Sequence, residues 1–117
     1  MTIRIVIAED EAIIRLDLRE TLIEEGYEVV ADTGRGDTAI ELVRQHQPDV
    51  AIFDIKMPGM DGMAFLKRLM GMDSGLPVIM ITGHATLDSA VDAMKAGAYH
   101  YIAKPFRLAE AREVVRG

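Results

Sequence analysis

Cysteine is absent from this chain of 117 residues, and aromatic residues make up only 5% of it. Without cysteine the chain can form no disulfide and hold no metal through thiolates. With few aromatic residues and no cluster of basic ones, it offers no platform for stacking bases. We therefore expect no nucleic-acid binding by this domain alone.

Long apolar runs are also absent. No run approaches the 18 residues that a membrane-spanning helix needs, and Met1 leads directly into "TIRIVIAED", which has no signal-peptide features. We therefore expect a cytoplasmic protein with no membrane partner. Acidic residues outnumber basic ones by 19 to 13, and the resulting net charge of −6 favours solubility.

The residues that are present predict a single α/β domain spanning 1–117. Hydrophobic residues make up 50% of the chain and charged residues 27%, as in ordinary globular proteins. Short apolar runs alternate with amphipathic helical patterns. The predicted strands are 3–8, 27–31, 49–54, 76–82 and 98–104. The predicted helices are one that carries Ile14, Leu18 and Leu22 and stops at Gly26, followed by 38–46, 63–70 (with Asp61 as its N-cap), 87–96 and 108–116.

This alternation predicts a doubly wound parallel sheet. Five strand–helix units with short connections place helices on both faces of the sheet. Right-handed crossovers then favour the flavodoxin-like strand order 2-1-3-4-5. In such a fold, function gathers beyond the carboxyl ends of the strands.

Those strand ends carry reactive side chains. The first strand is followed by Glu9 and Asp10, the third ends at Asp54, the fourth at Thr82 and the fifth at Lys104. The first and third strands are neighbours in the predicted order. We therefore expect the three carboxylates to converge at one edge of the sheet.

Three carboxylates at close range need a proton or a cation among them. Each pair about 4 Å apart repels by about 4 kcal/mol at an effective dielectric constant of 20. Either a shared proton raises a pKa, or a divalent cation binds. Carboxylate oxygens favour Mg²⁺, Mn²⁺ or Ca²⁺ over zinc, and Mg²⁺ often shares its shell with phosphate oxygens. Asp54 is then a candidate nucleophile for a phosphoryl group, with Lys104 and Thr82 placed to bind that group.

Four motifs resemble those of the response-regulator receiver domains of two-component signalling, the CheY-like family. They are "AEDE" at 8–11, "FDIKMPGMDG" at 53–62, "ITGHA" at 81–85 and "YIAKPF" at 101–106, and the resemblance covers essentially the whole chain. It implies that Asp54 is the phosphoacceptor and that Asp10 binds Mg²⁺. Glu9 would assist through water, and Lys56 would offer its backbone carbonyl. Many members carry aspartate where Glu9 stands, which could alter metal affinity.

The same resemblance implies a switch. Thr82 would be the switch hydroxyl, Tyr101 the switch aromatic and Lys104 the phosphate-binding lysine. Phosphorylation would draw Thr82 inward and let Tyr101 move, changing the face made by the fourth helix and fifth strand. The side chains of Lys56 and His84 would tune the lifetime of the aspartyl phosphate.

The resemblance also implies partners. The phosphoryl donor would be a sensor histidine kinase that contacts the first helix. A homodimer could form through the helix 87–96, the strand 98–104 and the helix 108–116. The first half of the chain resembles receivers of RNA-binding antiterminators, and the second half those of transcriptional activators. We therefore expect control of transcription or antitermination through an output domain that is absent or removed.

Three alternatives remain. The first is a receiver-like interaction domain that is never phosphorylated, although the complete acid, threonine and lysine set argues against it. The second is an aspartate-nucleophile phosphatase of the haloacid-dehalogenase type, which needs an aspartate where Lys56 stands. The third is a flavin-binding protein, in which "EDEAI" at 9–13 would repel phosphate. We expect no enzyme activity beyond the domain's own phosphorylation and dephosphorylation.

Overall fold

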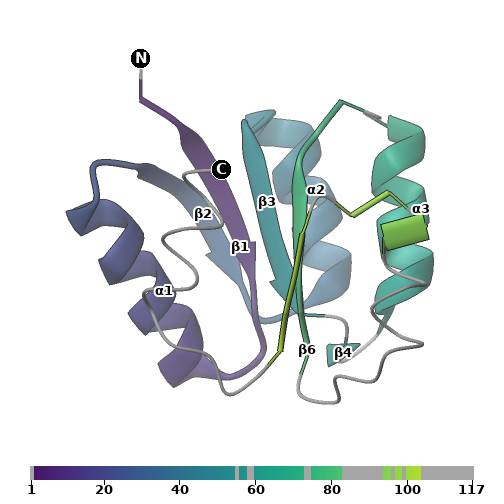
Figure 1. The fold of residues 1–117 in the computed structure, drawn as a ribbon, viewed down its shortest axis with the longest axis horizontal. Helices are drawn as coiled ribbons and strands as arrows, with labels where there is room; N and C mark the ends of the chain where they lie inside the picture. Colours follow the sequence, from purple (N-terminus) through teal and green to yellow (C-terminus); the bar gives the residue numbers. More distant parts are fainter. Residues whose placement is uncertain are drawn as a thin grey trace.

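The computed structural model describes residues 2–54, 56–57, 60–72, 75–82, 94–95, 97–98 and 100–103. Its centre is a five-stranded parallel sheet in the order β2-β1-β3-β6-β7 (Figure 1). Along the chain this is the predicted order 2-1-3-4-5. The strands are β1 (Arg4–Ala8), β2 (Glu28–Thr33), β3 (Val50–Asp54), β6 (Val78–Thr82) and β7 (His100–Ala103).

In the part of the chain that the structure describes, three helices cover the two faces of the sheet. α1 (Ala12–Glu24) lies on one face, and α2 (Gly36–His46) and α3 (Gly62–Met72) lie on the other (Figure 1). The helix predicted at 87–96 falls within the described residues only at Met94 and Lys95, which are helical. The helix predicted at 108–116 lies outside them.

The core has two layers because successive side chains of a strand point to opposite faces. Ile5 and Ile7 of β1 pack in a cluster with Leu18 and Leu22 of α1. The other face holds a second cluster, which contains Val6, Ala8, Ile40, Val43, Phe53, Leu66, Leu69 and Met80. Strands that are buried on both faces have nearly continuous apolar sequences, and for this reason the sequence predicted them.

The first two helices end with left-handed backbone close to their last turns. Gly26 follows α1 with φ of +95°, and its amide donates to the carbonyl of Ile23, as expected for a glycine that stops a helix. Gln47 takes the same role after α2, with φ of 46° and ψ of 62°. This conformation, together with Pro48 one residue later, ends α2 at His46.

Two local features differ from the sequence-based prediction. A small antiparallel pair, β4 (Lys56–Met57) with β5 (Met60–Asp61), precedes α3. Asp61 therefore belongs to this pair as well as preceding the helix, whereas the sequence suggested only a helix cap. β2 also continues to Thr33, two residues beyond its predicted end, because an edge strand tolerates polar residues.

Helices long and apolar enough to cross a membrane are not found in the described part of the chain.

Candidate metal centre

The register of the central strands builds the acidic site. Ala8 of β1 lies opposite Phe53 of β3, so the next residues, Glu9 and Asp54, follow at the same edge of the sheet. The amide of Glu9 donates to the carbonyl of Thr33 at 2.9 Å, which continues the β1–β2 pairing beyond the strand end. The peptide that enters the site is therefore anchored to its neighbouring strand.

Glu9, Asp10 and Asp54 converge as the sequence predicted. One carboxylate oxygen from each lies within 4.8 Å of the others. Glu9 is fully buried and Asp54 is 4% exposed, whereas Asp10 is exposed to solvent. Two acidic residues are thus held largely away from water, and the third lies at the surface. Burial and mutual repulsion both make it unfavourable to hold three negative charges together here.

This set of donors fits a hard divalent cation. An octahedral Mg²⁺ ion with bonds of about 2.1 Å holds its ligand oxygens about 3 to 4 Å apart, and the three carboxylates need little movement to reach that spacing. All three donors are carboxylates, which favours Mg²⁺ over zinc. Because one donor is exposed, the site opens to solvent and leaves room for water or a phosphate oxygen.

The remaining predicted residues are located only through their backbones. Asp54 lies opposite Ile81 in the β3–β6 pairing, so Thr82 ends β6 at the edge that carries the carboxylates. Thr82 in turn lies opposite Ala103 of β7, and Lys104 is the next residue of the chain, outside the described part. Tyr101 lies in β7, and the side chains of Thr82 and Tyr101 are not among those described.

The other predicted residues are placed as follows. Lys56 is in β4, two residues after Asp54, with its side chain outside the description, and His84 is not among the described residues. The predicted dimer face is described only in β7, Met94, Lys95, Gly97 and Ala98. Its role stays a prediction, as do the roles assigned to Thr82, Tyr101 and Lys104.

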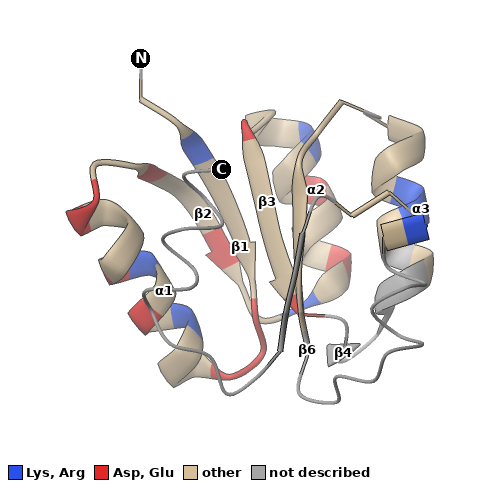
Figure 2. Ribbon diagram, viewed as in Figure 1, with Lys and Arg blue, Asp and Glu red and all other residues tan. Residues whose placement is uncertain are grey.

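Sequence reasoning missed one residue beside the acids. Arg15, in the first turn of α1, donates from Nη1 to the backbone carbonyl of Glu9 at 2.6 Å. Its Nε lies 3.3 Å from Oδ1 of Asp32 at the end of β2, and Arg19 lies 3.6 Å from the other oxygen of Asp32. Figure 2 shows acidic positions on the loop after β1 and on β2, with basic positions of α1 beside them. The only sequence signal was a basic residue near a helix start.

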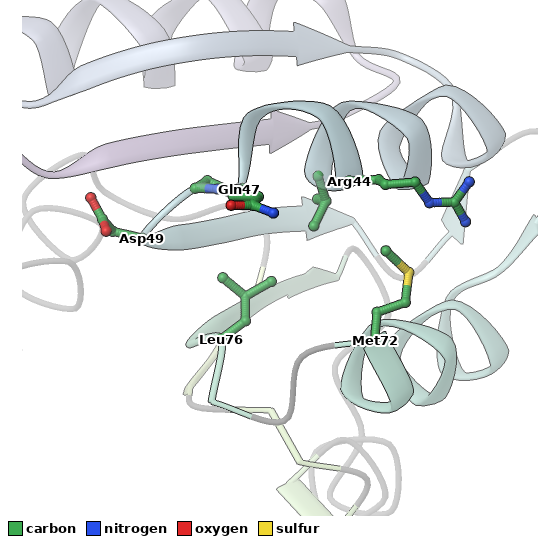
Figure 3. Close-up of a pocket in the computed structure, with 7 residues that line it drawn as sticks. Arg44, Gln47, Asp49, Met72 and Leu76 are labelled. Carbon is green, nitrogen blue, oxygen red and sulfur yellow. The ribbon is translucent and has the colours of Figure 1, made fainter.

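A surface pocket lies at the opposite end of the strands from the acidic site, where β3 and β6 begin. It lies between the C-terminal ends of α2 and α3 (Figure 3). Apolar side chains line it together with one basic and one acidic residue; the lining is Val43, Arg44, Gln47, Pro48, Asp49, Met72 and Leu76. It gathers no set of carboxylates, unlike the strand-end site.

The sequence is similar to one protein family and to several known proteins. The response regulator receiver domain family matches residues 5–116. The transcriptional regulatory protein PdtaR of Mycobacterium tuberculosis is 42% identical over 107 residues, which cover 92% of this chain and 52% of PdtaR. The chemotaxis protein CheY of Bacillus subtilis is 36% identical over 115 residues, covering 98% of this chain and 96% of CheY. The chain thus spans about half the length of PdtaR and nearly all of CheY.

A solved structure shares the fold. A chain in the crystal structure of the CheX–CheY–BeF3–Mg complex from Borrelia burgdorferi superposes with a TM-score of 0.93 and 27% identity, covering 97% of this chain and 86% of that chain. The family match covers nearly the whole sequence, and the strand order and acidic cluster agree with the motifs that first suggested it. The chain therefore belongs to the response regulator receiver domains of two-component signalling.

Proposed function

We propose that this domain accepts a phosphoryl group on Asp54 and, in response, switches a protein-interaction face. The observation that carries the proposal is the convergence of Glu9, Asp10 and Asp54 at the strand ends, with oxygens within 4.8 Å of each other. Asp54 ends an interior strand of the sheet and lies opposite Ile81 of β6. Its backbone is therefore held by the β3–β6 pairing.

Mg²⁺ would be held by carboxylates of differing exposure. Asp10 and Asp54 supply direct ligands, Lys56 supplies its backbone carbonyl, and buried Glu9 acts through water. The bound ion would supply positive charge that offsets the charge on a transferring phosphoryl group. The CheX–CheY complex from Borrelia burgdorferi, which contains both BeF3 and Mg, supports the same pairing of metal and phosphoryl mimic here.

The transfer step uses one carboxylate oxygen as the nucleophile. An Asp54 oxygen attacks phosphorus, a P–O bond forms, and the P–N bond of a donor phosphohistidine breaks. The imidazole nitrogen leaves with the electron pair of that bond and is then free to take a proton from water. Lys104 and Thr82 bind oxygens of the new aspartyl phosphate, and Tyr101 follows the movement of Thr82. The side chains of Lys56 and His84 tune how long the phosphoryl group persists.

The donor is a sensor histidine kinase or a related phosphotransfer protein that contacts α1. The helix exposes three large apolar side chains, with Ile13 77%, Leu16 53% and Ile23 49% exposed. They lie on one side of the helix, since residues three apart and ten apart are close in angle on a 3.6-residue period. An exposed apolar strip of this kind suits contact with a partner helix.

The output is control of transcription, because PdtaR is named as a transcriptional regulatory protein. The domain acts in the cytoplasm, and the only reactions that it catalyses are its own phosphorylation and dephosphorylation. A homodimer through the face that includes β7 would transmit the signal, and nucleic-acid contact would be made by another part of the protein.

The test is the intact mass of the protein after incubation with acetyl phosphate, with and without Mg²⁺. We expect one phosphoryl group on the wild type with Mg²⁺, with acetate as the leaving group, and none on Asp54→Asn. Asp17→Asn, which removes an exposed acid of α1, is the matched control and should be labelled like the wild type.

Failure of the wild type to gain a phosphoryl group would favour the interaction-only alternative, provided that the adduct is not simply short-lived. Fluorine NMR with beryllofluoride separates these cases, because the mimic does not hydrolyse. Binding of beryllofluoride with no detected phosphoryl adduct would mean rapid loss. Absence of both would overturn the proposal.

A further inference from the structure

The loop that carries Glu9 and Asp10 is held from two sides by groups outside the acidic set. On one side, the amide of Glu9 donates to the carbonyl of Thr33. On the other, the Arg15 guanidinium donates to the carbonyl of Glu9 at 2.6 Å. Since the Glu9 carbonyl and the Asp10 amide share one planar peptide, fixing that carbonyl also fixes the direction in which Asp10 leaves the strand.

Arg15 is itself held in place. Its Nε lies 3.3 Å from Asp32, and its side chain is only 25% exposed. A guanidinium can meet a carboxylate and a carbonyl at the same time because its donors form a rigid fork. Asp32, at the end of β2, thus orients Arg15, and Arg15 orients the Glu9–Asp10 peptide.

Gly34 leaves the space that this contact requires. A Cβ on Gly34 would lie 2.8 Å from Nη1 of Arg15, closer than real Cβ atoms approach. The same Cβ would lie 3.7 Å from the Cα of Asp10 and 3.7 Å from the carbonyl oxygen of Glu9, which are ordinary contacts. A methyl group at position 34 would therefore displace the guanidinium while leaving the loop backbone in place.

We propose that Arg15, admitted by Gly34 and oriented by Asp32, is a positioning residue for the metal site: it sets the backbone from which Glu9 and Asp10 present their carboxylates. This inference rests on the proposed function, because it concerns the affinity of the same site for Mg²⁺. The structure gives Arg15 a backbone contact with a metal-site residue, and its influence on the ion acts through that contact.

Arg15 has two opposite effects on the affinity of the site for Mg²⁺. A positive charge beside the acids repels a divalent cation, so removing the charge alone would tighten Mg²⁺ binding. Loss of positioning would weaken it, because residues that orient metal ligands typically change affinity by about 10- to 100-fold. The direction of the change in Arg15→Gln therefore distinguishes positioning from charge.

The experiment is titration of the wild type and variants with MgCl₂ by isothermal calorimetry. Mn²⁺ binding followed by electron paramagnetic resonance gives a second readout that does not depend on phosphorylation. We expect Arg15→Gln to raise the Mg²⁺ dissociation constant about tenfold, at the lower end of the range for orienting residues. Arg15→Lys should also raise it, although the charge is unchanged, because lysine lacks the fork.

Gly34→Ala is the sharpest variant because it leaves Arg15 and its charge in the protein. We expect it to weaken Mg²⁺ binding, and to add little when combined with Arg15→Gln, since both act through one contact. Arg19→Gln is the matched control. It removes the same charge from the same helix and also lies beside Asp32, so its Mg²⁺ affinity should be unchanged or slightly higher.

Circular dichroism melts confirm that each variant is folded before its affinity is interpreted. If the wild type binds Mg²⁺ but Arg15→Gln binds it equally well or more tightly, the positioning role is wrong and the metal site stands. Equal weakening by Arg19→Gln would also overturn it, because the effect would then belong to the Asp32 ion pairs. Absence of Mg²⁺ binding by the wild type would overturn the proposed metal site and this inference together.

Discussion

Replacing Asp54 with asparagine should stabilise the folded protein when no divalent cation is present. Asp54 is 4% exposed, and one of its carboxylate oxygens lies within 4.8 Å of oxygens from Glu9 and Asp10. At this separation and an effective dielectric constant of 20, each pair of charges repels by about 3.5 kcal/mol. Asp54→Asn removes two of these repulsions and keeps the size of the side chain.

The net gain is smaller than the gross repulsion. Asp10 is exposed, so solvent screens its charge, and interactions that depend on the Asp54 charge are weaker in the amide. We expect the free energy of unfolding to rise by about 1 to 3 kcal/mol, which lies within the range of single-substitution effects. The chain has no tryptophan, so unfolding by urea in EDTA is best followed by far-ultraviolet circular dichroism.

Asp17→Asn is the control, since it makes the same chemical change at an exposed position of α1. Its stability should stay within about 0.5 kcal/mol of the wild type.

Adding Mg²⁺ at 20 times its dissociation constant should then stabilise the wild type by about 1.8 kcal/mol, and Asp54→Asn by less. If Asp54→Asn is no more stable than the wild type in EDTA, the protein already neutralises the three charges, and the argument that they require a cation fails.

Two further predictions concern other parts of the fold. Gln47 holds φ of 46° after α2, so Gln47→Gly should raise stability by about 0.5 kcal/mol in urea unfolding, as relief of left-handed strain exceeds the entropy that glycine adds to the unfolded chain; a loss of stability would contradict this. The pKa of Asp37 is lowered by its hydrogen bonds from the Arg35 side chain and the Thr38 amide, so its folded-state stabilisation is complete above the ordinary pKa and disappears as pH falls through the lowered one. Arg35→Gln should raise the pKa of Asp37 in a carbon NMR titration, and an unchanged value would show that Arg35 does not act on it.

Most of the fold could be predicted because both faces of the sheet are buried. The apolar runs at β1, β3 and β6 have the short length of buried strands, and glycine marks the end of α1. The short β4–β5 pair was missed because two-residue strands carry no periodicity. The end of β2 was missed because Asp32 and Thr33 are polar, and only the structure shows that Asp32 meets Arg15 and Arg19.

The acids of the site could be predicted, but their support could not. Glu9 and Asp10 follow one predicted strand and Asp54 ends another, and the strand order brings them together. Arg15 lies six residues from Glu9 and looks like any polar residue on the exposed side of a helix. Its contact depends on the angle at which the chain enters α1 and on the missing side chain at Gly34, and neither can be read from local sequence.

The pairing of β1 and β3 has a consequence for how the molecule opens. Both strands have hydrogen-bonded neighbours on each side, whereas β2 and β7 lie at the edges of the sheet. Amide hydrogens in such interior strands exchange with solvent only when the whole domain unfolds, while those in edge strands and loops exchange through smaller openings. Asp54 thus belongs to the part of the domain that opens last, and Glu9 and Asp10 follow directly on the other interior strand.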